Sequence, residues 1–278
     1  QLTLEDNNYS IFEGPVKNFW NRILQIKDGY VANDPLNNVE NAEFLASLIS
    51  EVKNMSNFSL EFKDNNVIKF SISEEYQALL KENYLDSEII SLNDLQNSFA
   101  INYVETKLKE KGFKSGFLMD MSGNFSAFET CPESELKLYD STNLKDSIHF
   151  SNLKVEGGLK VYQLNRFNRE YDVIDKSYLI NKNDVSYLRS AYVDLDDGYD
   201  SGLKLLSATS SSTKNLVEVA LQNINSTRFK NVTDLKNYFA SNTSYDLIYR
   251  LANEQNKIYA TSGIKSKIEL QKTDYEII

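Results

Sequence analysis

Residues 91–128 constrain the fold most strongly, because they place a helix, two short strands and two turns in immediate succession. Apolar residues recur at helical spacing up to residue 111, with Asn93 or Asp94 as the expected N-cap. Gly112 is expected to end this helix. The apolar run GFLMDM then predicts a short buried strand, which Ser122-Gly123-Asn124 connects to a second strand. A strand that ends in small residues lets a phosphate or cofactor approach the backbone closely.

The rest of the chain alternates between helical and strand periodicity. We expect helices over residues 16–26, 38–53, 73–84, 210–222 and 232–240. We expect strands within residues 57–72, 135–138, 158–161, 171–174, 203–208, 244–251 and 257–260, and an irregular polar stretch over 183–202. This order predicts an α+β fold with mixed, mostly antiparallel sheets and flanking helices. Residues 1–40 are predicted to be an N-terminal extension and residues 41–278 a single domain.

Charge and hydropathy exclude several classes of partner. The net charge is −10, and no cluster of Lys and Arg stands out, so the chain lacks the basic surface that nucleic acid requires. The same balance disfavours binding to anionic lipid. No apolar run approaches the length of a membrane-spanning helix. We therefore expect no nucleic-acid partner and no membrane span in this chain.

Cysteine and histidine are too scarce for several kinds of site. Cys131 is the only Cys, which excludes an internal disulfide and a thiolate zinc site. A Ser-His-Asp triad would depend on His149, the only His, and no Gly-x-Ser-x-Gly motif accompanies it. The aspartates between residues 194 and 200 lack the spacing of a calcium loop, which favours a solvated acidic loop.

Four segments, in order, resemble the ApbE-type flavin transferases, which are FAD:protein FMN transferases. Residues 91–102 (SLNDLQNSFAIN) stand where this family has a motif before a helix, and FLMDM with Ser122-Gly123-Asn124 stands where it has a strand and Gly-Gly-Asp or Gly-Gly-Asn. Residues 162–176 and 203–221 resemble the two later motifs. The resemblance covers residues 40–265: apolar positions agree, whereas polar positions differ.

The resemblance implies a magnesium-dependent reaction that cleaves FAD and transfers FMN to a Thr or Ser of a partner protein. It also implies which positions would act. The family's Lys corresponds to Asn97, the Asp that ends the first motif to Asn102, the motif His to Asp172 and the metal-holding Asp to Asn215. The expected cofactor-binding residues are Ser122, Gly123, Asn124 and Asp175.

Neutral amides therefore occupy three positions where the family carries charge. An amide supplies neither an ammonium for phosphate nor the anionic oxygen that magnesium prefers. We interpret the chain as a degenerate ApbE-like pseudoenzyme that has lost FMN transfer. It would act as a surface binding or assembly protein with a protein partner and at most weak flavin binding; FAD and magnesium would bind only if the family site survives.

Two alternatives stay open. The first is an active magnesium-dependent FMN transferase in which Asp94, Lys214 or Glu218 compensates for the missing groups. The second is a surface interaction protein unrelated to the family, with a coincidental α+β pattern. Because members of the family are commonly lipoproteins or exported, the resemblance also implies an extracellular or membrane-anchored location.

Overall fold

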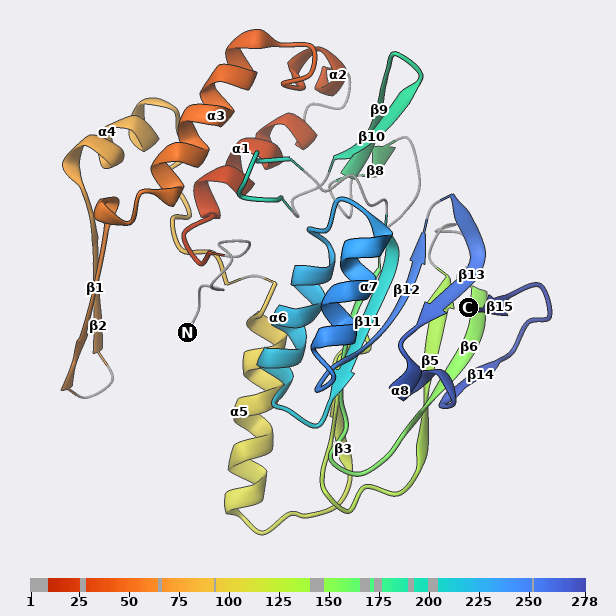
Figure 1. The fold of residues 1–278 in the computed structure, drawn as a ribbon. Coiled ribbons are helices and arrows are strands. Elements are labelled where there is room, and N and C mark those ends of the chain that lie inside the picture. Colours follow the sequence, from red (N-terminus) through yellow and green to blue (C-terminus); the bar gives the residue numbers. More distant parts are fainter. Residues whose placement is uncertain are drawn as a thin grey trace. The chain divides into compact units, whose positions relative to one another are not determined.

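The computed structural model describes residues 10–25, 29–64, 67–92, 94–140, 148–165, 171–172, 177–189, 193–199, 205–251 and 253–278. These residues group into two compact units (Figure 1). The first comprises Gln1–Ser91 and Tyr171–Asp200, and the second comprises Leu92–Glu170 and Ser201–Ile278. The expected extension 1–40 supplies two helices to the first unit, and the single domain over 41–278 stays a prediction.

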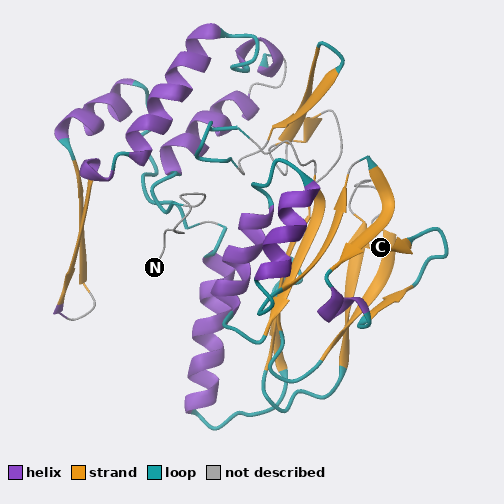
Figure 2. Ribbon diagram, viewed as in Figure 1, coloured by secondary structure: helices purple, strands orange, loops and turns teal. Residues whose placement is uncertain are grey.

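The first unit combines helices with two small antiparallel sheets (Figure 2). Its helical elements are α1 (Gly14–Gln25), α2 (Tyr30–Asn33), α3 (Val39–Lys53), the 3-10 turn η1 (Met55–Asn57) and α4 (Glu74–Glu82). Its strands are β1 (Phe58–Lys63), β2 (Val67–Ile72), β8 (Tyr171–Asp172), β9 (Ser177–Lys182) and β10 (Val185–Arg189). Trp20 lies fully buried in its core and donates its indole N–H to the Gly198 carbonyl at 2.7 Å.

The sequence predicted most secondary-structure elements of this unit correctly. Ser73 caps α4, as expected, because its hydroxyl accepts the Tyr76 N–H at 3.2 Å. The prediction that residues 183–202 are irregular is wrong for Val185–Arg189, which form β10 and pair with β9. Asn183 and Asp184 join these strands with φ of +52° and +62°. Two successive left-handed residues match the right-handed twist of a hairpin, and Asn and Asp tolerate that conformation better than most residues.

The second unit contains a seven-stranded and a three-stranded sheet. The larger has the order β15-β13-β12-β11-β7-β4-β3, and the smaller β14-β6-β5. The larger sheet comprises β3 (Phe117–Met119), β4 (Phe125–Ala127), β7 (Lys160–Asn165), β11 (Leu205–Ser212), β12 (Asp246–Leu251), β13 (Glu254–Ala260) and β15 (Glu276–Ile277). The smaller comprises β5 (Ser134–Asp140), β6 (Ile148–Val155) and β14 (Ile268–Leu270). The helices are α5 (Gln96–Glu110), α6 (Leu216–Ser226), α7 (Val232–Ser241) and α8 (Ser262–Lys265).

Among the described residues of the second unit, two apolar clusters hold the elements together. One joins the two sheets and includes Phe125, Val161 and Leu153. The other joins α7 to β11 and β12, with Leu235 and Phe239 against the sheet. Every described strand pair is antiparallel except β13 with β15. The predicted α+β fold with mostly antiparallel strands and flanking helices is therefore confirmed.

Three helix starts in the second unit differ from expectation. Leu95, not Asp94, precedes α5 and provides no side-chain cap; Asn93 lies outside the described residues. Residues 210–212 continue β11, so α6 begins later than predicted. Asparagines cap α6 and α7 instead of the expected Ser or Thr, because the amide oxygens of Asn215 and Asn231 accept the third backbone N–H of each helix.

The strand expected to be buried before residue 122 is exposed. β3 pairs only with β4 and forms one edge of the sheet as described. Phe117 and Met119 are consequently 50% and 55% exposed. Among the described residues, no helix has both the length and the apolar character needed to cross a bilayer.

Candidate functional site

Asp120 organises the turn between β3 and β4. One oxygen of its carboxylate, Oδ1, accepts the backbone N–H groups of Ser122 and Asn124, each at 2.9 Å. The other oxygen, Oδ2, accepts the side-chain amide of Asn124 at 2.7 Å. A short acidic side chain that accepts backbone N–H groups two and four residues ahead fixes a tight turn. We call residues 120–124 the Asp120 turn.

The first helical turn of α5 completes the coordination of this carboxylate. Asn97 donates its amide Nδ2 to Asp120 Oδ2 at 2.9 Å. Four N–H donors therefore surround the Asp120 carboxylate, and the structure brings the predicted residues Asn97 and Ser122–Asn124 together. Sequence reasoning missed Asp120 itself because it was assigned to the buried strand. The signal was an Asp two residues before Ser-Gly-Asn, which is typical of a side-chain-capped turn.

Gln163 of β7 fastens the turn to the sheet. Its backbone N–H donates to Asn124 Oδ1 at 2.9 Å, and its side-chain amide donates to the Gly123 carbonyl at 2.8 Å. Gly123 has φ of +84°, and a β-carbon there would lie 2.5 Å from Gln163 Nε2. Both the backbone conformation and the close side chain therefore require glycine at this position.

A cavity of about 620 Å³ lies beside the Asp120 turn within the second unit. Its volume falls in the range typical of small-molecule sites. Its lining combines charged side chains of β5, polar residues of the turn and apolar side chains. The lining residues are Met119, Asp120, Met121, Ser122, Gly123, Glu135, Leu136, Lys137, Tyr139 and Gln163.

The other predicted site residues are not part of the Asp120 turn. Asn102 lies five residues beyond Asn97 on α5, which places it about 140° away around the helix axis. Asp172 belongs to β8 in the first unit, and Asp175 lies outside the described residues. The structure thus brings together part of the predicted set, namely Asn97, Ser122, Gly123 and Asn124.

Asn215 is occupied as a helix cap. Its Oδ1 accepts the Glu218 N–H at 3.0 Å, and its Nδ2 donates to Glu218 Oε1. The second oxygen of Glu218 accepts the Tyr245 hydroxyl at 3.1 Å. Burial, and then the charge and hydrogen bond of Glu218, raise the pKa of Tyr245 to about 12. The Asn215 amide and the Glu218 carboxylate therefore satisfy each other.

The strand register also separates Asn215 from the Asp120 turn. Gln163, which holds the turn, pairs with Thr209 of β11, whereas Ser212 pairs with Lys160. These two positions are three residues apart, about 10 Å along the sheet. Asn215 follows Ser212, so it lies beyond the end of β11 that is farther from the turn.

A buried ion pair anchors α5 to the sheet. Glu105 and Lys160 are 3% and 6% exposed, and Lys160 Nζ lies 2.6 Å from Glu105 Oε1. Ser126 Oγ donates to Glu105 Oε2 at 2.5 Å, and Lys109 Nζ lies 2.9 Å from Oε1. Burial alone would raise the pKa of Glu105, but these hydrogen bonds outweigh it and hold the pKa below its usual value. Burial lowers the pKa of Lys160 more than Glu105 raises it.

Comparison with solved structures identifies the fold. No protein-family model and no curated protein sequence matches this chain. The flavin transferase ApbE from Vibrio cholerae is 12% identical, with a TM-score of 0.59 over 94% of this chain and 71% of that one. The ApbE protein from Thermotoga maritima is 12% identical, with a TM-score of 0.57 over 94% of this chain and 72% of the other. The chain has an ApbE-like fold.

A third ApbE structure agrees. The apo flavinyl transferase ApbE from Pseudomonas stutzeri is 12% identical to this chain, with a TM-score of 0.57 over 94% of this chain and 69% of that one. The ApbE-like fold expected from the order of the four motifs is therefore confirmed. It argues against a coincidental α+β pattern.

Magnesium does not fit the described residues of the Asp120 turn or of the Asn215 cap. Nitrogen donors surround the Asp120 carboxylate, and the Asn215 amide engages Glu218. Magnesium requires carboxylate or water oxygens with free lone pairs. Across the part of the chain that the structure describes, no three His, Cys, Asp or Glu side chains form a group that could hold a metal ion.

Proposed function

We propose that this protein binds its ligands through an ApbE-like scaffold and does not transfer FMN. The observation that carries the proposal is the closed hydrogen-bond arrangement of the Asp120 turn. Phosphoryl transfer needs free charged groups to hold a metal and to neutralise phosphate. Here the corresponding region contains amides that hold a carboxylate in a structural turn.

Two of the three groups named for the alternative of relocated catalysis, Glu218 and Lys214, are placed unfavourably for it. Both oxygens of Glu218 are hydrogen-bonded, to Asn215 and to Tyr245. Lys214 follows β11, and its backbone N–H donates to Ser212 Oγ at 3.1 Å. By the register given above, it too lies beyond the end of β11 that is farther from the Asp120 turn. These two groups therefore do not rebuild a reaction centre beside that turn.

We propose flavin as the first ligand to test at the cavity beside the Asp120 turn. The ApbE structures from Vibrio cholerae and Pseudomonas stutzeri are flavin transferases, and the cavity has a size suited to a ring system with a polar tail. Lys137 of β5 supplies an ammonium at its lining. Binding without metal is expected because the described residues form no magnesium site.

A calorimetric titration with FMN and FAD, with and without magnesium, tests this proposal. We expect saturable binding that magnesium does not change. Lys137→Met should weaken binding about two- to fivefold, as for an exposed charge pair. Lys154→Met, on the neighbouring β6, serves as the matched control, because Lys154 is exposed and does not line the cavity.

A transfer assay tests the loss of catalysis directly. The protein is incubated with FAD, magnesium and an acceptor peptide, and the Vibrio cholerae enzyme serves as the positive control. We expect no FMN on the peptide by mass spectrometry. Transfer above background, or flavin binding that requires magnesium, would contradict the proposal.

A protein partner is a second component of the proposed function. Met119 is 55% exposed and Met121 fully exposed beside the cavity, and contiguous apolar groups that stay in water can mark an interaction surface. The Gly116 carbonyl accepts the Phe128 N–H, and the Asp120 N–H donates to the Asn124 carbonyl. Backbone groups of successive residues point alternately toward and away from the partner strand in an antiparallel pair, so those of Phe117 and Met119 point away from β4. A partner strand could pair there.

Photo-methionine crosslinking tests this surface, because the chain has only three Met residues. Crosslinks to a partner should map to Met119 or Met121. Met55, which is 56% exposed in the first unit, is an internal control. Crosslinks through Met55 alone would contradict the assignment. We further propose an extracellular or membrane-anchored location, by analogy with the family, and surface proteolysis of intact cells would test it.

A further inference from the structure

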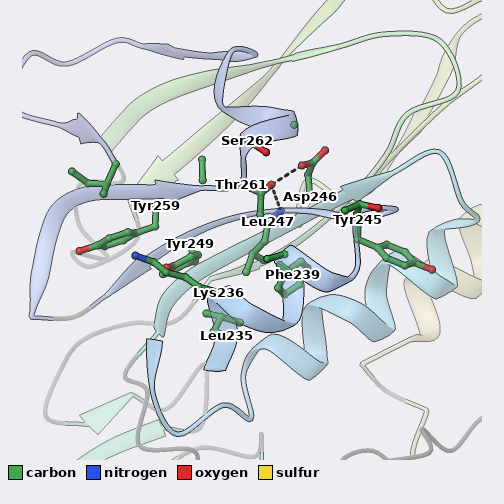
Figure 3. A pocket seen from close by; sticks show the side chains of 15 residues that line it. Leu235, Lys236, Phe239, Tyr245, Asp246, Leu247, Tyr249, Tyr259, Thr261 and Ser262 are labelled. Carbon is green, nitrogen blue, oxygen red and sulfur yellow. Dashed lines mark hydrogen bonds between the residues drawn. The ribbon is translucent and has the colours of Figure 1, made fainter. Parts of the chain in front are cut away.

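A second cavity lies in the second unit where α7, β12, β13 and α8 meet. Its volume is about 480 Å³, and it shares no lining residue with the cavity beside the Asp120 turn. Figure 3 shows its side chains at close range. The lining residues are Leu235, Lys236, Phe239, Ala240, Thr243, Tyr245, Asp246, Leu247, Tyr249, Tyr259, Ala260, Thr261, Ser262, Gly263 and Ile278.

One end of this cavity is an aromatic platform with an ammonium group. Tyr249 and Tyr259 are register partners on β12 and β13, and their rings stack with centroids 5.0 Å apart and an interplanar angle of 10°. Lys236 of α7 places its Nζ 5.2 Å from the centroid of the Tyr259 ring. Glu254 also approaches this end, but it already accepts the Tyr259 hydroxyl and pairs with Lys257 at 3.5 Å.

The other end presents a fixed carboxylate. Thr261 donates its hydroxyl to Asp246 Oδ1 at 2.6 Å, and the same hydroxyl oxygen accepts the Leu247 N–H at 3.2 Å. Gly263 packs closely against this carboxylate, because a β-carbon there would lie 2.5 Å from Asp246 Oδ1. The carboxylate is thus held in place before any ligand arrives.

An apolar floor separates the two charged ends. Leu247 and Phe239 are 1% and 3% exposed, and Figure 3 shows them between Asp246 and Lys236. Asp246 and Tyr249 are three residues apart on β12, which corresponds to about 10 Å. The cavity therefore offers a carboxylate, an apolar surface and an ammonium group, in that order.

We propose that this cavity binds a short peptide with free termini and apolar side chains. Three extended residues span about 10 Å, which matches the spacing of Asp246 and Tyr249 along β12. The peptide's ammonium group pairs with Asp246, its side chains lie over the apolar lining that stays accessible, such as Ala240 and Ile278, and its carboxylate pairs with Lys236. This inference is independent of flavin binding, because the two cavities have separate linings.

Isothermal titration calorimetry with the tripeptide Leu-Phe-Leu tests the proposal. We expect saturable binding to the full chain. Acetylating the amino terminus or amidating the carboxyl terminus removes one charge-assisted hydrogen bond each, which should weaken binding about tenfold or more. No measurable heat at millimolar peptide, or equal binding of free and capped peptides, would overturn the proposal.

Variants then assign each terminus to its partner. Asp246→Asn should weaken binding of the free peptide about tenfold and leave binding of the acetylated peptide unchanged. Lys236→Met should also weaken binding of the free peptide about tenfold, but it should leave binding of the amidated peptide unchanged. Gly263→Ala should act like Asp246→Asn because it displaces the carboxylate. An Asp246→Asn variant that binds free peptide as tightly as the native chain would also overturn the proposal.

Controls separate binding from folding. Asp274→Asn and Lys265→Met change exposed residues of the same unit that do not line the cavity, so both should retain native affinity. Far-UV circular dichroism melts of all variants check the fold. If the two controls lose affinity as much as Asp246→Asn and Lys236→Met do, the assigned charge pairs are wrong.

Discussion

Replacing Lys160 with Met should destabilise the protein substantially. The substitution keeps the apolar stem of the side chain but leaves Glu105 buried without its closest cation, which lies 2.6 Å away. Removing one partner of a buried pair typically costs about 3–5 kcal/mol. Ser126 and Lys109 still donate to Glu105, so we expect the lower end of the range, about 3 kcal/mol. For a unit of this size, that corresponds to a fall in Tm of about 6–12 °C.

Urea denaturation followed by far-UV circular dichroism measures this loss. The double variant Glu105→Leu with Lys160→Met should recover most of the stability, because an apolar pair of similar volume can replace a buried ion pair at little cost. A single variant within about 0.5 kcal/mol of the native chain, the usual range for surface substitutions, would refute the reasoning. So would a double variant less stable than the single one.

The same ion pair predicts how stability depends on pH. The pKa of Glu105 in the folded chain is below its usual value of 4.5, so the folded state binds fewer protons than the unfolded state at mildly acidic pH. The stabilisation from Glu105 is present above pH 4.5 and is lost as pH falls through the lowered pKa. The gap in stability between the native chain and Lys160→Met should therefore narrow below that pH.

Two further substitutions probe the turn and the α6 cap. In urea denaturation, Gly123→Ala should destabilise the protein by about 1–2 kcal/mol because of the left-handed backbone, and by a further amount because of the clash with Gln163. The control Gly158→Ala should show only the backbone cost, because Gly158 has φ of +81° and open space around it. Equal losses would show that the clash is relieved. Glu218→Gln should lower the pKa of Tyr245 from about 12 toward 10 in a carbon-13 tyrosine titration, because it removes the carboxylate charge; an unchanged pKa would assign the shift to burial alone.

Local signals predicted the fold better than they predicted the site. The helix α3 and the hairpin of β1 and β2 follow from periodicity and turn residues close in sequence. The Asp120 turn depends on Asn97 and Gln163, which lie 23 and about 40 residues away along the chain. No local sequence pattern predicts such contacts, because the fold alone brings these side chains together.

The prediction that β3 is buried was wrong for a related reason. The run GFLMDM is apolar enough for a buried strand, but burial depends on the position of a strand in its sheet. β3 has a neighbour on one side only in the described sheet, so Phe117 and Met119 stay in water. Strand order is a property of the whole unit and cannot be derived from one six-residue segment.

The amide that caps α6 has a consequence for how this sequence can evolve. Asn215 both accepts the backbone N–H of Glu218 and donates to its carboxylate, and Asn231 makes the same pair of bonds with Asp234 at the start of α7. A single Asn215→Asp change would place two anionic side chains face to face at that helix start, where like charges repel. An acidic residue at position 215 is therefore favourable only together with a second mutation at 218 or a neutralising cation.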